Sequence, residues 1–353
     1  MRVLTVTPGF PGSARLEERP EPDLRDGEVL VRTLAVGICG TDREIVAGGY
    51  GEPPPGEERL VIGHESLGEV IEAPAGCGLA PGDRVVGIVR RPDPVPCSSC
   101  AVGEWDMCRN GRYTERGIKG LHGYGAERFR IPREYAVRVD PGLGLGAVLL
   151  EPASVVAKAW NHIDRIGRRA TWHPRRALVT GAGPIGLLAA LLGTQRGLEV
   201  HVLDRVTDGP KPGLVRDLGA TYHTGSVADA CPDADVVLEC TGVGQLVFDV
   251  MRSVGPAGIV CLTGVSSGGR KLVVDAAALN RELVLENNVV FGSVNANRGH
   301  YEAGAGALAR AERSWLERLL TRRVPLERWA EALARRAGDV KTVLTFAPGV
   351  NPA

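Results

Sequence analysis

Several features that mark specialised proteins are scarce in this sequence of 353 residues. Basic residues are not in excess, because 42 Lys and Arg balance 42 Asp and Glu, and a nucleic-acid surface normally needs a basic excess or patch. Only five of the basic residues are lysine, a bias that we attribute to genomic composition. Eight cysteines are too few for a disulfide scaffold in a chain of this length. The chain opens without the pattern of a secretory leader, so we expect a cytoplasmic protein that does not bind nucleic acid.

Long apolar runs are also rare. Residues 177–195, ALVTGAGPIGLLAALLGTQ, form a stretch of 19 residues without a charge. Four glycines and a proline within it predict a strand, a tight turn and a buried helix rather than a membrane span. We therefore expect no membrane association.

What the chain does contain is enough apolar sequence for two cores, with 44% hydrophobic and 24% charged residues. The first 150 residues hold short β-like runs between Gly and Pro, which favours a barrel-like β domain. From about residue 154 strands alternate with helix-like segments, as in a parallel sheet covered by helices. After residue 295 the pattern predicts two helices, over 306–323 and 326–336, and a last strand over 340–346. The segment DGPKPG at 208–213 is predicted to be a surface loop.

A glycine motif predicts nucleotide binding. Gly181, Gly183 and Gly186 form G-x-G-x-x-G directly after an apolar strand and at the start of a helix, where free backbone amides favour a pyrophosphate. Asp204 follows Gly186 by 18 residues and can accept the ribose hydroxyls of the adenosine half, which favours NAD over NADP. Arg205 comes next and could instead hold a 2′-phosphate. A glycine turn that serves packing alone is the other interpretation.

A second set of residues carries the donor types that zinc takes. Cys39 in GICGTD, His64 and Glu65 in GHES, and Glu151 in LLEPAS offer a thiolate, an imidazole and carboxylates. Their spread along the chain proves little, because singly each could be a core cysteine, a satisfied histidine or a surface charge.

Together these motifs resemble the zinc-dependent medium-chain dehydrogenase/reductase superfamily, and within it the glucose 1-dehydrogenase-like sugar dehydrogenases. The segments that carry the resemblance span essentially the whole chain: GICGTDREIVAGGYGEPPPG, LVIGHESLGEV, the cysteine-rich stretch, ERGIKGLHGYGAER, LLEPASVVAKAW and GAGPIGLLAALL. The resemblance implies an α/β protein with a GroES-like β-barrel catalytic domain, residues 1–157 and 295–353, and a Rossmann NAD(P)-binding domain with a doubly wound parallel sheet, residues 158–294. It also implies a homodimer or homotetramer.

The resemblance further implies that Cys39, His64 and Glu151 hold a catalytic zinc that Glu65 can enter or leave. A bound Zn²⁺ acidifies a coordinated hydroxyl, and hydride then passes from the alcohol to the nicotinamide. Thr41 would relay the proton, although it could simply cap a helix. The residues expected to contact the cofactor are Gly181, Gly183, Pro184, Ile185, Gly186, Asp204, Arg205, Thr241, Thr263 and Asn295.

A cysteine-rich stretch, DPVPCSSCAVGEWDMC, contains Cys97, Cys100 and Cys108. Relatives have a fourth cysteine where this chain has Pro94, so the first ligand of a structural zinc site is missing. Asp93 is the nearest replacement, which would give a Cys3Asp site. Free thiols are the alternative, and a redox CxxC is disfavoured because no helix-starting context is evident.

The resemblance assigns substrate contacts to Glu115 and His300, although His300 could equally be a surface histidine. Two other expected polar positions hold Val89 and Val155. The loss of two polar partners predicts a cyclitol, amino sugar or similar polyol as substrate, with glucose itself as the alternative. A zinc-free quinone-type reductase and a noncatalytic cofactor-binding protein are the other hypotheses.

Overall fold

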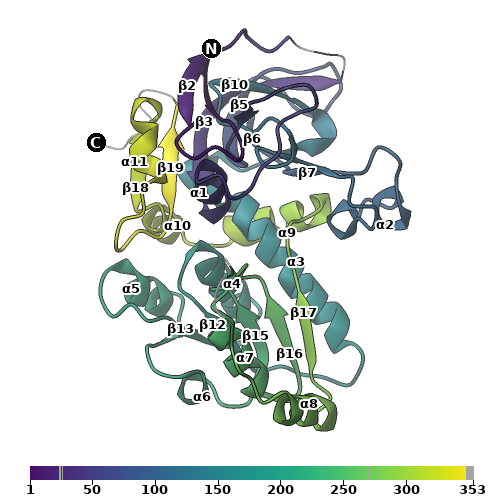
Figure 1. Cartoon of the computed structure of the whole chain (residues 1–353), viewed down its shortest axis with the longest axis vertical. Coiled ribbons are helices and arrows are strands. Elements are labelled where there is room, and N and C mark those ends of the chain that lie inside the picture. Colours follow the sequence, from purple (N-terminus) through teal and green to yellow (C-terminus); the bar gives the residue numbers. More distant parts are fainter. Residues whose placement is uncertain (24, 26, 267, 269–270, 347–353) are drawn as a thin grey trace. The chain divides into compact units, whose positions relative to one another are not determined.

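The computed structural model describes residues 1–346 except 24, 26, 267 and 269–270, and the chain separates into two compact units (Figure 1). Unit 1 comprises Met1–Ser154 and Asn295–Ala353, and unit 2 comprises Val155–Val294. The first boundary therefore lies after Ser154 rather than after residue 157, inside one helix. Residues 347–353, which the predicted catalytic domain includes, lie outside the described part.

Unit 1 is built around a mixed sheet in the order β11-β6-β5-β3-β19-β18, with β10 also paired to β3. Smaller sheets, β2-β1-β4 and β7-β8-β9, complete it. Its strands are β1 (Arg2–Val6), β2 (Arg15–Glu18), β3 (Glu28–Ile38), β4 (Leu60–Val61), β5 (Glu65–Glu72), β6 (Arg84–Gly87), β7 (Arg90–Arg91), β8 (Thr114–Arg116), β9 (Gly120–Leu121), β10 (Arg128–Pro132), β11 (Ala136–Arg138), β18 (Arg322–Pro325) and β19 (Thr342–Thr345).

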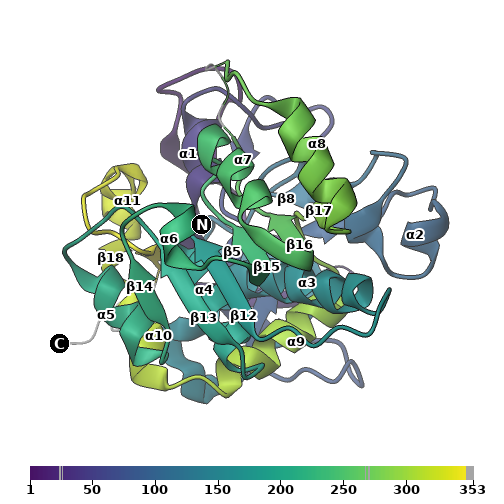
Figure 2. The ribbon, with the colours of Figure 1, turned by 90° about the horizontal axis from the view of Figure 1, so that it is seen from below.

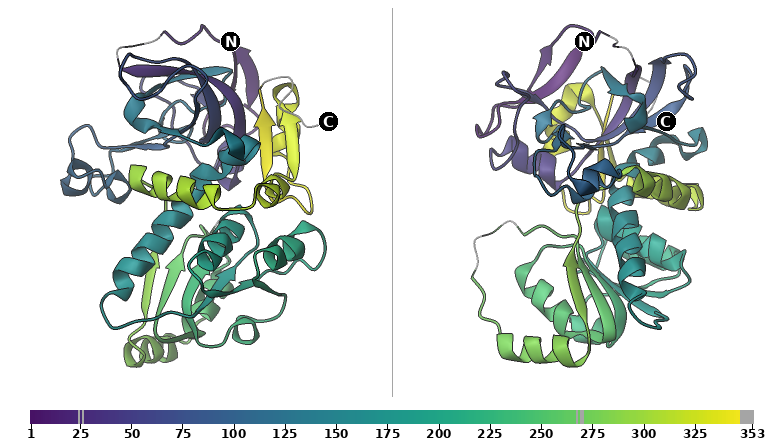
Figure 3. Two further views of the ribbon diagram at one scale, coloured as in Figure 1. Left: turned by 180° about the vertical axis from the view of Figure 1, so that it is seen from behind. Right: turned by 90° about the vertical axis from the view of Figure 1, so that its right-hand side faces the viewer.

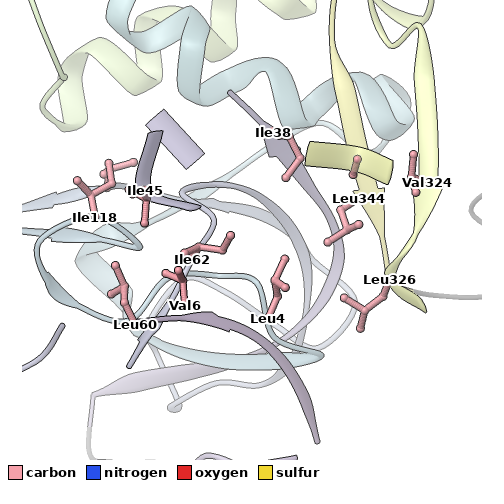
Figure 4. Packing of buried hydrophobic residues seen from close by; sticks show 12 residues of the cluster. Leu4, Val6, Ile38, Ile45, Leu60, Ile62, Ile118, Val324, Leu326 and Leu344 are labelled. Atoms are coloured by element: carbon pink, nitrogen blue, oxygen red, sulfur yellow. The ribbon is translucent and has the colours of Figure 1, made fainter. Parts of the chain in front are cut away.

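Short helices connect these strands. The helices of unit 1 are α1 (Gly40–Val46), α2 (Ser98–Ala101), η1 (Trp105–Met107), η2 (Arg133–Tyr135), η3 (Pro141–Leu149), α9 (Arg298–Ala309), α10 (Arg313–Leu319), η4 (Leu326–Arg328) and α11 (Trp329–Leu333), and α3 (Leu150–Gly167) runs from this unit into unit 2. Both faces of β1 are buried, because Leu4 and Val6 join one hydrophobic cluster and Val3 joins another. Figure 4 labels members of the cluster that contains Leu4 and Val6, which brings β1, α1 and the C-terminal strands β18 and β19 together.

Unit 2 contains six parallel strands in the order β14-β13-β12-β15-β16-β17 (Figure 2). Helices cover both faces of this sheet (Figure 3), with α4 and α5 packed together on one side and α6 and α7 on the other. The elements are β12 (Arg176–Thr180), α4 (Pro184–Thr194), β13 (Glu199–Leu203), α5 (Pro210–Asp217), β14 (Thr221–His223), α6 (Val227–Ala230), β15 (Ala234–Glu239), α7 (Gly244–Arg252), β16 (Val254–Leu262), α8 (Ala276–Leu285) and β17 (Val289–Gly292). This is the α/β class that the sequence predicts.

Three local predictions are wrong. The helix expected over 306–323 is broken after Ala309, because the chain turns so that α9 and α10 each bury their own apolar face, and residues 322 and 323 belong to β18. The helix expected over 326–336 reduces to η4 and the five-residue α11. The predicted loop at 208–213 contains the start of α5, for which Pro210 supplies the first helical residue.

The apolar stretch 177–195 folds as β12, a turn and α4, as predicted. Among the described residues, one helical stretch, Pro141–Gly167, is long and apolar enough to cross a membrane, and 72% of its most apolar window is buried inside the protein. A core helix meets the same criterion, so this stretch is weak evidence for a span.

Candidate functional site

The structure brings Cys39, His64 and Glu65 together. One candidate ligand atom from each lies within 4.8 Å of the others, and Cys39 Sγ is 3.1 Å from His64 Nε2. The register of β3 and β5, which pairs Gly37 with Glu65, explains the convergence because Cys39 and His64 flank that pair. Thiolate, imidazole and carboxylate are the donor types of a zinc site, so these residues fit the ion that the sequence predicts.

Asp42 orients the histidine. Its carboxylate accepts a hydrogen bond from the Cys39 amide at 2.9 Å and lies 3.3 Å from His64 Nδ1. The contact at Nδ1 directs Nε2 toward Cys39, as carboxylate partners do for metal-binding histidines. Burial alone would lower the pKa of His64, but the Cys39 thiolate and Asp42 raise it well above its ordinary value. The surroundings of the imidazole therefore favour a positive charge. Sequence reasoning missed Asp42, although an acid in the first helical turn after the cysteine was visible.

Glu65 pairs with Lys341 in the interior. Lys341 Nζ contacts Glu65 Oε2, and the two side chains are 2% and 3% exposed. Gly37 makes this possible, because a Cβ there would lie 2.1 Å from Glu65 Oε2 and 2.8 Å from Lys341 Cε. Burial alone would lower the pKa of Lys341, but the charge of Glu65 raises it. Sequence reasoning also missed Lys341. Its position next to an apolar strand, in a chain with only five lysines, was the feature that could have indicated a special role.

Glu151, in the first turn of α3, is outside the close group but responds to it electrostatically. Burial raises the pKa of Glu151 to about 7, Glu65 adds to the shift, and the cations His64 and Lys341 oppose it. The charges of this cluster therefore act on the carboxyl group of Glu151.

Thr41 is not a helix cap. The cap of α1 is Cys39, whose Sγ accepts a hydrogen bond from the Thr41 amide at 3.2 Å. The threonine thus occupies the first turn of α1, beside the thiolate.

The two predicted substrate residues are buried and belong to one polar network. Glu115 is 5% and His300 is 9% exposed, so His300 is not a surface histidine. Asn295, predicted as a cofactor contact, donates to Glu115 Oε1 at 2.7 Å and has a left-handed backbone with φ of 62°.

A second donor group contains Cys97, Cys100 and Cys108, whose sulfurs lie within 4.8 Å of one another. The α2 helix begins directly after Cys97, contrary to the expectation, but it has only four residues. Backbone amides of Arg109 and Cys100 lower the pKa of Cys97 to about 6, whereas burial raises the pKa of Cys100 to about 11.

Asp93 does not join this group. Its Oδ1 accepts a hydrogen bond from the Val95 amide at 2.8 Å, and its Oδ2 faces Arg112 Nε at 3.4 Å. Among the described residues, no carboxylate therefore joins the three thiols in a group whose ligand atoms all lie within 4.8 Å of one another.

The glycine motif has the geometry of a phosphate-binding turn. Gly181 has φ of +88°, and a Cβ on Gly186 would lie 1.7 Å from the Gly181 carbonyl oxygen. A Cβ on Gly183 would meet nothing within 4 Å, so space is open beside it. Pro184 and Ile185 open α4, whose first amides no side chain caps. The turn can therefore receive an anion.

Asp204 is already engaged at the end of β13. Its carboxylate accepts from the Ala182 amide at 2.7 Å and pairs with Lys211 Nζ at 3.0 Å. Burial would raise the pKa of Asp204, but the Lys211 hydrogen bond lowers it overall. Arg205 follows Asp204 in the sequence and is exposed. Asp204 therefore has one cation next to it in the sequence, Arg205, and one in contact with it, Lys211. Sequence reasoning missed Lys211 because it assigned that segment to a loop.

Glu239 organises the next loop. This carboxylate, which is 0% exposed, accepts from the amides of Thr241 at 2.7 Å and Gly242 at 3.2 Å. The backbone carbonyl oxygen of Glu239 accepts hydrogen bonds from the Thr263 amide and hydroxyl at 2.8 and 2.9 Å. The two predicted cofactor threonines therefore share one anchor at the carboxyl ends of β15 and β16.

Two family models match the chain. Residues 25–141 match the alcohol dehydrogenase GroES-like domain, and residues 145–346 match the glucose dehydrogenase C-terminus. The second match spans more than half of the sequence.

Relatives match over nearly the full length. A glucose 1-dehydrogenase of Methanocella arvoryzae is 41% identical, covering 98% of this chain and 99% of the relative. The structure is similar to that of Haloferax mediterranei glucose dehydrogenase in complex with NADP, zinc and gluconolactone, with a TM-score of 0.90, 35% identity and 98% and 99% coverage. It also shares its fold with galactitol-1-phosphate dehydrogenase of Escherichia coli, with a TM-score of 0.80, 24% identity, and coverage of 98% of this chain and 100% of that one.

Proposed function

The chain belongs to the glucose dehydrogenase family within the zinc-dependent medium-chain dehydrogenase/reductase superfamily, and from that premise we propose that it oxidises an aldopyranose such as glucose at C1 with NADP. The products are the lactone, NADPH and a proton. The observation that carries the proposal is the close group of Cys39, His64 and Glu65, in which His64 and Glu65 are buried and contact Asp42 and Lys341.

Cys39, His64 and Glu151 would hold the zinc, which would supply Lewis-acid chemistry that lowers the pKa of a substrate hydroxyl. The chain prepares the site for it: Asp42 fixes the imidazole, and the Thr41 amide stabilises negative charge on Cys39 Sγ. Lys341 holds Glu65 at the edge of the group. The Thr41 hydroxyl would pass the released proton onward, and Glu115 and His300 would contact sugar hydroxyls.

Glucose is better supported than the cyclitol or amino sugar that the two valines predict. Glucose 1-dehydrogenases that are 41% and 40% identical match over 98% of this chain. Val89 is 1% exposed and packs in the hydrophobic cluster of unit 1, which gives its apolar side chain a core role. The missing polar group at that position is therefore a weak argument for an unusual substrate.

NADP is better supported than NAD for a related reason. The sequence alone predicts that Asp204 repels a 2′-phosphate. Lys211 neutralises Asp204, so this repulsion is weaker than predicted. Arg205 adjoins Asp204 and adds positive charge for such a phosphate.

The test is to measure reduction of NADP and NAD by the zinc-loaded protein with glucose and with a panel of other aldoses, polyols, cyclitols and amino sugars. We expect glucose oxidation to gluconolactone, faster with NADP. No turnover of any aldose, in protein shown to bind zinc and NADP, would contradict the proposal.

A further inference from the structure

We propose that Arg90 and Asp106 are positioning residues that hold Glu115 and His300 in place to recognise the hydroxyl groups of the substrate. The inference rests on the proposed function, because Glu115 and His300 are assigned to the sugar there. All four residues lie in unit 1.

Arg90 fixes one oxygen of Glu115. Its Nε and Nη2 lie 3.0 and 2.9 Å from Glu115 Oε1, and the two side chains are 7% and 6% exposed. Asn295 Nδ2 donates to the same oxygen at 2.7 Å. The ring of Tyr113, 3.7 Å from the Arg90 guanidinium carbon, holds the cation from another side. Three N–H groups directed at Oε1 restrict the carboxylate to one orientation, so that its second oxygen is presented in a fixed direction.

Asp106 orients His300 through Asn297, the residue that caps the helix on which His300 lies. Asp106 Oδ1 accepts from Asn297 Nδ2 at 2.8 Å, and Asp106 Oδ2 lies 3.9 Å from His300 Nδ1. Asn297 caps α9, and His300 occupies its third helical position, where Nδ1 faces the Asn297 amide at 3.3 Å. These contacts at Nδ1 restrict the ring of His300 to one orientation.

One residue joins the two halves of this network. Arg90 Nη1 donates to the Asp106 carbonyl oxygen at 3.1 Å, and Asp106 lies in η1 between Cys100 and Cys108. The cysteine-rich segment thereby supplies a fixed backbone acceptor for the arginine that holds Glu115. A substrate hydroxyl gains most from partners that are already oriented, since a loose polar group loses discrimination between hydroxyl patterns.

The first test compares Arg90→Met with Arg91→Met. Arg91 is the matched control, because it stacks on Tyr135 and donates to the Ile88 carbonyl oxygen. We expect Arg90→Met to raise the KM for glucose by about tenfold or more, the effect of losing about one oriented hydrogen bond to a charged group. The expected changes in kcat and in the KM for NADP are within about threefold, because that hydrogen bond contributes to sugar binding before hydride transfer.

A second arm tests whether Arg90 acts through Glu115. In a Glu115→Gln background, Arg90→Met should add little to the KM for glucose, because coupled residues are not additive. Equal and additive increases in the two backgrounds would contradict the positioning role. Asp106→Ala should give the same pattern of raised KM, with Asp106→Asn as the conservative variant that restores most of it.

Crystal structures of Arg90→Met and Asp106→Ala complete the test without relying on turnover. Displaced Glu115 and His300 side chains support the inference, and unchanged positions overturn it whatever the substrate is. Failure of the proposed function has a different signature, namely a wild-type protein that oxidises no aldose.

Discussion

The two sulfur-containing groups of unit 1 differ in how the chain builds them. Cys97, Cys100 and Cys108 lie within 12 residues of one another and are joined by two short helices. The other group draws Cys39, His64 and Lys341 from segments that are about 300 residues apart at the extremes. Among the described residues, the local group offers three thiols and no carboxylate that joins them, whereas the distant group mixes sulfur, nitrogen and oxygen donors with a buried lysine.

The difference teaches what each group can do. A set of thiols on a short segment is the donor type of a structural zinc site, whose ligands come from that segment and require little from the rest of the fold. A buried set of mixed donors needs neighbours that orient each ligand and balance its charge, which is the arrangement that catalytic metal sites use.

Replacing Cys39 with Ala should have the largest effect. Loss of a direct ligand should lower kcat/KM by more than about 100-fold, since even residues behind the ligands cost 10–100-fold. Turnover and zinc content by elemental analysis would be measured together, with Cys77→Ala as the control. A variant that keeps both its zinc and its turnover would refute the assignment of the catalytic group.

Lys341→Met should break the buried pair and leave Glu65 charged without a partner. We expect about 3–5 kcal/mol lower free energy of unfolding, measured by denaturant titration. The double variant Lys341→Met/Glu65→Gln should recover most of this loss, because no buried charge remains. If the single and double variants are equally unstable, the pair does not explain the loss.

The smallest effect concerns thiol reactivity in chelator-treated protein. Cys97 should react with iodoacetamide with a midpoint near pH 6, while burial raises the pKa of Cys231 to about 11 and keeps it slow. Because folding lowers the pKa of Cys97 from 9.0, its contribution to stability is complete above pH 9 and is lost as pH falls through about 6. Labelling would be measured at pH 7 by mass spectrometry. Equal labelling of Cys97 and Cys231 would contradict the predicted difference in reactivity.

Much of the fold could be predicted from the sequence because its signals are local. The strand, glycine turn and helix at residues 176–194 follow from apolar periodicity and from glycine and proline positions. The break between α9 and α10 could not be predicted, because the apolar repeat on both sides suits one long helix. Only packing shows that the two segments bury separate faces.

The candidate site divides in the same way. Sequence alone determined the residue types that could bind zinc, the glycine turn for the cofactor and the alternation that makes a parallel sheet, since each depends on near neighbours in the chain. The tertiary structure decided that Lys341 meets Glu65 over Gly37, that Lys211 neutralises Asp204, and that Arg90 joins Asp106 to Glu115. These contacts depend on strand register and on burial, which bring together charges that no spacing along the chain connects.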